Sequence, residues 1–209
     1  MELNTWIAYF IACWLISLSP GPGAISCMSA GMRYGYAKAV WNIVGLIVGI
    51  LTVVAVIGAG LGALLIASST AFTVVKWVGV GYLVYLGIQQ WRAPPRPLAA
   101  EPGDRETVTP RDLFLRGFFV NITNPKGTAF MLAVLPQFID PARPQTMQYV
   151  ICGATLGLTD LVIMSGYTAI AAQMLRWLRE ERHIRWMNRF FGTLFVGAGA
   201  VLATFKRAA

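Results

Sequence analysis

Six runs of apolar residues, each long enough to cross a lipid bilayer, follow one another through this chain of 209 residues. An α-helix rises ~1.5 Å per residue, so roughly 20 apolar residues cross the hydrocarbon core. Backbone polar groups within lipid must find partners in the chain itself, which leaves the helix as the structure for such runs. The sequence therefore predicts an all-α, polytopic membrane protein. The predicted transmembrane helices are Thr5–Met28, Ala39–Ala67, Phe72–Trp91, Leu113–Ile139, Met147–Trp177 and Trp186–Phe205.

The composition excludes several other classes of protein. The chain is 56% hydrophobic and 12% charged, about half the charged share of a soluble domain, and little of it remains outside the apolar runs. The net charge of +8 comes from basic residues in short loops without interleaved aromatics, so we do not expect nucleic-acid binding. Cys13, Cys27 and Cys152 lie within apolar runs and are interpreted as packing residues.

The distribution of basic residues predicts the orientation in the membrane. The first, third and fifth loops hold ten basic residues, whereas the second and fourth loops and the C-terminal tail hold three. Positive loops face the cytoplasm, so the odd-numbered loops are predicted to be cytoplasmic and both termini to face outward. The ten are Arg33, Lys38, Arg92, Arg96, Arg105, Arg111, Arg176, Arg179, Arg182 and Arg185, and the three are Arg143, Lys206 and Arg207.

The chain divides into two similar halves. A Pro-rich cytoplasmic linker over residues 93–112 separates a three-helix unit over 1–92 from a second over 113–209. Each half opens with a span interrupted by proline and closes with a span that starts Lys76-x-x-Gly79 or Arg189-x-x-Gly192. Since each half has an odd number of spans, the second enters from the opposite side. This arrangement predicts a 3+3 inverted repeat with broken helices 1 and 4, a pattern typical of transporters.

The two breaks form the first part of the candidate binding site. Proline removes a backbone hydrogen bond in a helix, and glycine lets a ligand approach the backbone closely. The free N–H groups at one half-helix end suit a carboxylate, and the free carbonyls at the other suit an ammonium. An α-amino acid carries both groups. The break residues are Ser19, Pro20, Gly21, Pro22 and Gly23 in the first span, and Asn121, Asn124, Pro125 and Lys126 in the fourth.

Two ionisable residues lie deep within the predicted spans. A charge at mid-membrane costs roughly 3 kcal/mol on insertion scales, so such residues usually serve a function. Lys126 could hold a substrate carboxylate, or it could occupy the place of a transported cation and switch with protonation. Asp160 could pair with Lys126, bind a substrate ammonium or carry a proton. Both residues are therefore candidates for proton coupling. The alternatives are a structural role for Lys126, paired to carbonyls or to an acid, and a purely structural ion pair for Asp160.

Further polar residues are candidates to line the same cavity. Asn121 and Asn124 lie one turn apart and flank the second break, and Tyr167 shares a helix face with Asp160 seven residues earlier. Asn42 is equally compatible with cavity lining and with a helix–helix hydrogen bond. The single histidine, His183, lies in an arginine-rich loop, and the acidic residues do not cluster within the spans. We expect no metal site, no cofactor, no catalytic triad and no phosphate-binding loop, and therefore no enzyme.

Several motifs resemble the LysE/RhtB family of amino-acid exporters, over residues 5–205. They are Ser19-Pro20-Gly21-Pro22-Gly23, Gly31-x3-Gly35, Lys76-x2-Gly79-x2-Tyr82-Leu83-x-Tyr85-Leu86-Gly87, Phe118-x2-Asn121-x2-Asn124-Pro125-Lys126 and Pro136-Gln137-Phe138, with Asp160 in the fifth span. The resemblance implies a multi-pass protein of the bacterial inner membrane with periplasmic termini. It also implies proton-driven efflux, by antiport, of small neutral amino acids such as homoserine, threonine or leucine.

The partners expected on this reading are an amino-acid substrate, protons as the coupling ion and the lipid bilayer, with a homodimer left open. Two other functions remain as alternatives. The first is an exporter of a metal or other small ion, which would require more oxygen, sulfur or imidazole ligands within the spans. The second is a membrane assembly protein that transports nothing and uses the buried charges structurally.

Overall fold

The computed structural model describes residues 1–67, 69–95, 108–178 and 180–204, and these residues form helices joined by short connections. The helices that make up the first half are α1 (Leu3–Leu18), α2 (Pro22–Tyr34), α3 (Tyr36–Ala67) and α4 (Ser69–Arg92). The second half consists of α5 (Pro110–Ile122), α6 (Pro125–Val134), the 3₁₀-helix η1 (Leu135–Phe138), α7 (Gln145–Ala169), α8 (Ala171–Trp177) and α9 (Glu181–Thr204).

Both breaks predicted from the proline positions are present. α1 ends at Leu18 and α2 begins at Pro22, with an angle of 56° between the two helices. α5 ends at Ile122 and α6 begins at Pro125. Each proline occupies the first turn of the new helix, where its missing N–H removes no helical hydrogen bond. The prolines therefore start half-helices instead of kinking continuous ones.

Apolar helices of bilayer length are found within the described part of the chain. α3, over Tyr36–Gly60, and α7 are long and apolar enough to cross a membrane, and the bent pair of α1 and α2 makes a third such span if the two are taken together. The other helices carry more polar residues or are shorter pieces on either side of a break. The number of transmembrane helices and the repeat stay predictions.

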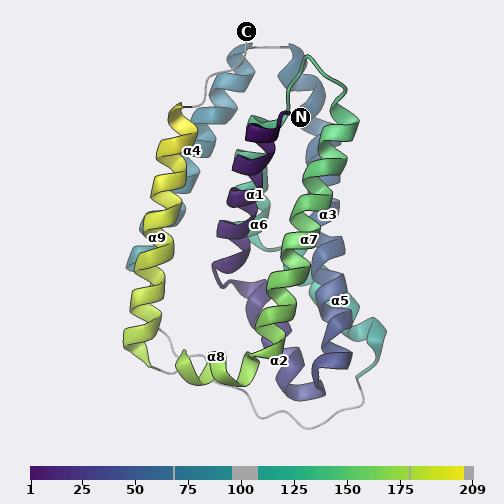
Figure 1. Cartoon of the computed structure of the whole chain (residues 1–209), viewed down its shortest axis with the longest axis vertical. Helices are drawn as coiled ribbons and strands as arrows, with labels where there is room; N and C mark the ends of the chain where they lie inside the picture. The colour runs from purple at the N-terminus through teal and green to yellow at the C-terminus, as the bar shows by residue number, and fades with distance from the viewer. Residues whose placement is uncertain (68, 96–107, 179, 205–209) are drawn as a thin grey trace.

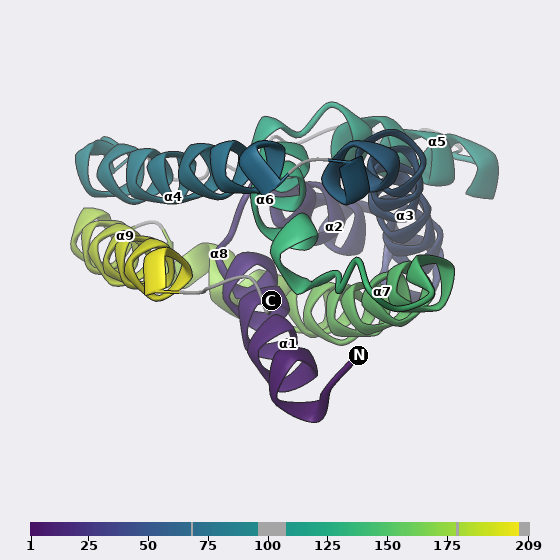
Figure 2. The same cartoon turned by 90° about the horizontal axis from the view of Figure 1, so that it is seen from above.

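The helices are arranged as one helix pair beside a larger group. α4 and α9 pack along each other, and α2, α3, α5 and α7 form the larger group (Figures 1 and 2). α1 and α6 lie between the two, so both helix breaks are at the centre of the molecule (Figure 2). The start of α1 and the end of α9 point toward the same end, whereas α8 and the end of α2 lie at the other (Figure 1).

The larger group is held together by an unusually close crossing of α3 and α5. A Cβ atom added to Gly45 would lie 2.0 Å from the Phe114 carbonyl oxygen, and one added to Gly117 would lie 2.1 Å from that of Asn42. The two backbones are thus in direct contact, as small residues allow in membrane helix pairs. Gly45 of α3 and Gly117 of α5 make this close approach possible.

The glycines of the two similar motifs also lie at helix crossings. A Cβ atom on Gly79 of α4 would meet the Ala133 carbonyl oxygen of α6 at 2.7 Å. One on Gly192 of α9 would meet the Gly87 carbonyl oxygen of α4 at 2.8 Å. Gly35, which ends α2, has a φ of 80°, a conformation that side-chain-bearing residues rarely adopt. It permits the sharp turn into α3.

The predicted fifth span is divided, which corrects its expected end at Trp177. α7 ends at Ala169, the backbone leaves helical geometry at Ile170, and α8 begins as a separate short helix. A helix from Met147 to Trp177 would be longer than the hydrocarbon core requires. Composition alone does not reveal the turn, because the sequence stays largely apolar across it, and α8 instead runs across one end of the molecule (Figure 1).

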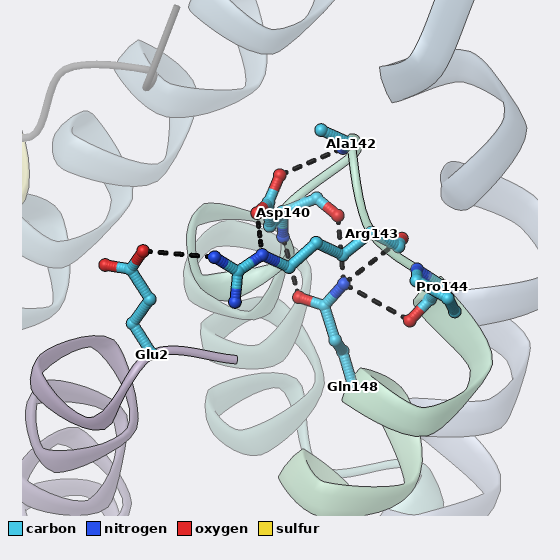
Figure 3. A network of polar contacts seen from close by, with 6 residues as sticks. All are labelled: Glu2, Asp140, Ala142, Arg143, Pro144 and Gln148. Atoms are coloured by element: carbon cyan, nitrogen blue, oxygen red, sulfur yellow. Dashed lines mark hydrogen bonds and ion pairs between the residues drawn. The ribbon is translucent and has the colours of Figure 1, made fainter.

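A polar network ties the start of α1 to the connection between η1 and α7 (Figure 3). The Arg143 guanidinium lies 3.2 Å from a Glu2 carboxylate oxygen and 3.1 Å from one of Asp140. The buried Gln148 side chain accepts from the Asp140 N–H at 2.8 Å and donates to the Asp140 carbonyl at 2.9 Å. These bonds satisfy backbone groups in a turn that would otherwise be unpaired.

Some predictions fall on residues outside the described ranges. They are most of the linker (96–107), Phe205 at the end of the last span, and the basic residues Arg96, Arg105, Arg179, Lys206 and Arg207.

The α3–α5 crossing generates a stability prediction. Gly117→Ala places a methyl group where the Asn42 carbonyl oxygen lies, so the helices must separate, and overpacking of this kind costs about 1–3 kcal/mol. Gly81→Ala is the matched control, since nothing lies within 4 Å of its added Cβ. Thermal unfolding of the purified variants in detergent should show a lower midpoint for Gly117→Ala and an equal or higher one for Gly81→Ala. Equal midpoints would contradict the crossing.

Candidate functional site

The ends of the interrupted helices border a small cavity of about 60 Å³, which is lined by charged, polar and apolar residues and is called the polar cavity below. That volume accommodates a few water molecules and is far below the several hundred Å³ of typical ligand pockets. α1 and α2 supply one wall, α5 and α6 the opposite wall, and α3 and α7 the sides. The predicted site residues in its lining are Ser19, Gly21, Gly23, Asn121, Asn124, Lys126 and Asp160.

Lys126 closes the broken end of α1. Its ammonium donates to the Ser19 carbonyl oxygen at 2.8 Å and to the Ser19 hydroxyl at 2.6 Å. The last carbonyls of a helix have no helical partner and carry the negative end of the helix dipole, so a cation is favoured there. The ammonium also lies 5.4 Å from the centre of the Phe195 ring. The lysine at the break between α5 and α6 thus binds the free end of α1 at the break between α1 and α2.

Asp160 of α7 faces the same cavity but binds a different serine. Its carboxylate accepts a hydrogen bond from the Ser17 hydroxyl, and the residue is 8% exposed. Two serines two residues apart at the end of α1 therefore bind opposite charges: Ser17 binds the carboxylate of Asp160, and Ser19 binds the ammonium of Lys126. Direct pairing with Lys126 was one of three roles left open for Asp160, and in the structure each of the two charged groups binds its own serine instead.

The two half-helices that begin at the breaks differ at their N-termini. The Asn124 side-chain oxygen accepts from the Lys126 backbone N–H at 3.1 Å and so caps α6. Gly21 precedes α2 and has no side chain to cap it. The first N–H groups of α2 belong to Gly23 and Ala24, since Pro22 has none, and both residues line the cavity. α2 therefore offers uncapped donors to the cavity.

The remaining predicted residues support the breaks without lining the cavity. The Tyr167 hydroxyl donates to the Leu18 carbonyl oxygen at 2.6 Å, which satisfies another free carbonyl at the end of α1. Pro22 and Pro125 start the new half-helices, and the Pro125 carbonyl accepts from the Tyr82 hydroxyl at 3.2 Å. Pro20 lies between α1 and α2. These residues shape the site rather than face its interior.

The asparagines separate into two groups. Asn121 lines the cavity and also donates to the Leu46 carbonyl oxygen of α3 at 2.7 Å. Asn42 is fully buried, donates to the Leu113 carbonyl oxygen at 3.1 Å and accepts from the Ser26 hydroxyl at 3.2 Å. Asn42 does not line the cavity, so of the two roles left open for it, the structure favours the helix–helix hydrogen bond.

Several lining residues were missed from the sequence. Ser17 is the most important, because it holds Asp160, and its position two residues before Ser19 in an apolar helix was the available signal. Gly127 and the side chains of Leu46, Met131 and Leu156 also border the cavity. Apolar lining residues carry no signal in a chain whose every helix is apolar.

Among the described residues, the cysteines and acidic side chains do not form a second candidate site. Cys13, Cys27 and Cys152 are free and buried, consistent with a packing role. Within the described residues, no three or more His, Cys, Asp or Glu side chains gather in a group that could hold a metal ion.

A family model described as LysE type translocator matches residues 14–205. The chain is 41% identical over 212 residues to a homoserine/homoserine lactone efflux protein of Salmonella typhimurium, covering all of both proteins. It is 40% identical over 206 residues to an uncharacterized membrane protein of Vibrio cholerae, covering 99% of this chain and all of that protein.

A more distant relative is a leucine efflux protein of an Enterobacter species, 29% identical over 205 residues and covering 97% of this chain and 96% of that one. No solved structure matches the chain at a significant level.

The Asn124 cap on α6 generates a prediction about the stability of the protein. Asn124→Ala removes the acceptor for the Lys126 N–H and should lower the free energy of unfolding by about 1 kcal/mol. Asn124→Ser keeps a capping oxygen and should recover most of that loss. Unfolding in detergent, followed by circular dichroism, measures both. If the alanine and serine variants are equally stable, the side chain does not act as a cap.

Proposed function

Because the chain belongs to the LysE type translocator family, we propose that it is a secondary active exporter of small neutral amino acids such as homoserine, threonine or leucine. Two relatives named as homoserine and leucine efflux proteins support this substrate class. The observation that carries the proposal is the cavity itself, where an ammonium and a carboxylate lie at the meeting point of two interrupted helices. In a bundle of apolar helices, such charges usually mark a transport pathway.

The cavity offers a separate partner to each charged group of an amino acid. The solute carboxylate binds the uncapped N–H groups at the start of α2, where the helix dipole is positive. The solute ammonium takes the place of the Lys126 ammonium at the Ser19 carbonyl, near the Asp160 carboxylate. Asn121 and Asn124 border the same space and offer further polar groups. Lys126 thus acts as a tethered substitute for the solute while the site is empty.

Export proceeds by alternating access around this site. In the proposed topology, six spans form two inverted three-helix units, and the odd-numbered loops face the cytoplasm of a bacterial inner membrane. The common direction of the start of α1 and the end of α9 supports this topology (Figure 1). A cavity of about 60 Å³ is too small for an amino acid, so this conformation is closed around the site. The solute enters when the helices on one side separate.

Proton coupling follows from the exchange of one ammonium for another. When a solute ammonium displaces that of Lys126, the lysine releases its proton, and the two positive charges never share the space beside Asp160. After the solute leaves on the outer side, a proton from that side restores the Lys126 ammonium, which binds Ser19 again. The protein without solute can then return to the conformation that opens toward the cytoplasm. Lys126 thus carries the proton inward, the Asp160 carboxylate balances the charge of whichever ammonium is present, and one solute leaves for each proton that enters.

This cycle predicts that Lys126→Met separates two transport modes. In vesicles containing the purified protein, uptake driven by a proton gradient should fall roughly tenfold or more, because the charged hydrogen bonds to Ser19 are lost. Solute-for-solute exchange should continue, since the solute carries its own ammonium. Lys38→Met, an identical change at an exposed lysine, is the control and should preserve both modes. Unchanged gradient-driven uptake would reject the role of Lys126.

A direct measurement of proton movement tests the coupling. Vesicles loaded with homoserine or leucine and containing a pH-sensitive dye should show proton entry as the amino acid leaves, and none with Lys126→Met. Amino-acid efflux without proton entry would support uncoupled transport. Vesicles that move no amino acid while metal ions pass would favour the ion exporter.

A further inference from the structure

A second cavity, of about 580 Å³, has an apolar lining and is partly open to the outside of the molecule, where the lining residues Ile11 and Val201 are more than half exposed. It is bounded by α1, α4, α6, η1 and α9. Among the described residues that line it, Thr193 alone has a polar side chain, and its hydroxyl donates to the Arg189 carbonyl oxygen at 2.9 Å. The lining residues used below are Ala12, Leu83, Phe130, Val134, Phe195 and Ala198.

A thin partition separates the two cavities. On α6, Met131 lines the polar cavity, whereas Phe130 and Val134 line the apolar one. Phe195 lines the apolar cavity and is 2% exposed, and its ring centre lies 5.4 Å from the Lys126 ammonium, which belongs to the polar cavity. Phe195, which lines the apolar cavity, thus lies next to Lys126, which lines the polar one. If the Lys126 ammonium moves away, one side of this ring loses its neighbour.

The sizes of the cavities indicate how a solute would divide between them. The charged groups of an amino acid require the helix ends and the polar cavity, which has room for little else. An apolar side chain gains free energy by leaving water and lipid headgroups for an apolar space, whereas a hydroxyl group loses free energy there unless it finds a partner. The neighbouring cavity is about tenfold larger than the polar one and offers almost no polar partner.

Building on the proposed function, we infer that the apolar cavity is the subsite for the solute's side chain and that Phe195 determines which side chains enter it. The displacement of Lys126 by the solute frees the adjoining side of the Phe195 ring, and the side chain passes it into the space beside Ala198 and Leu83. The ligand class is amino acids with aliphatic side chains of three or four carbons. A hydroxylated side chain of the same length binds less well.

The inference is tested in vesicles containing the full-length protein. Glycine, alanine, norvaline, leucine and homoserine compete with labelled leucine for exchange. For the unaltered protein, each added methylene should strengthen competition with labelled leucine roughly fourfold. Norvaline should compete at least roughly fourfold more strongly than homoserine, which has nearly the same shape. Ala198→Phe fills the cavity and should lower the ratio of norvaline to homoserine roughly tenfold, while glycine and alanine compete as before.

Ala200→Phe is the matched control, because Ala200 is exposed on the same helix and does not line the cavity. Ala12→Phe fills the cavity from α1 and should reproduce the effect if Ala198→Phe does not fold. Phe195→Leu replaces the ring that limits entry to the cavity with a smaller side chain, so phenylalanine should compete more strongly with labelled leucine. Equal selectivity profiles for Ala198→Phe and Ala200→Phe would overturn the inference.

Three other outcomes distinguish a failure of this inference from a failure of the proposed function. If Ala198→Phe and Ala12→Phe lower competition by every amino acid equally, the cavity holds a lipid acyl chain and the inference is rejected. If the unaltered protein exchanges no amino acid at all, the proposed function fails together with the inference. If it exchanges amino acids without dependence on side-chain length, only the inference fails.

Discussion

The contact between the Lys126 ammonium and the carbonyl oxygen of Ser19 is the interaction on which the site depends. A helix that ends within a membrane leaves carbonyl groups that lipid cannot satisfy. Here, a cation from the opposite half of the chain binds one of these groups, and the Tyr167 hydroxyl binds the neighbouring carbonyl of Leu18. The break in α1 is therefore stable only together with α6 and α7, and the cavity exists because the three helices complete one another.

The two breaks could be predicted because their causes are local. Proline cannot continue a helix at its own position, and this property does not depend on the tertiary structure. A lysine and an aspartate in apolar runs were equally visible, since few positions in such runs tolerate a charge. Both charged residues line one cavity, and the expectation that they lie close together came from their opposite charges within apolar spans rather than from a spacing pattern in the sequence.

The partners of these residues could not be predicted, because they depend on the rotation and depth of one helix against another. Ser17 binds Asp160 while Ser19 binds Lys126, and a small rotation of α1 would change both pairings. The same reason explains Asn42, which binds α5 instead of facing the cavity. The turn at Ile170 was missed because the residues on both sides of it are apolar, and only the packing of α7 decides where the chain turns.

The crossing of α3 and α5 has a mechanical consequence. Where two backbones touch without intervening side chains, as at Gly45 and Gly117, neither helix can slide along the other without first moving apart. Asn42 adds a hydrogen bond across the same crossing, so these two helices form a stiff unit that spans both halves of the chain. In the proposed transport cycle, conformational change would then be concentrated at the short unwound segments and between the α4–α9 pair and the larger group. The α3–α5 unit would then stay rigid while the α4–α9 pair moves relative to it.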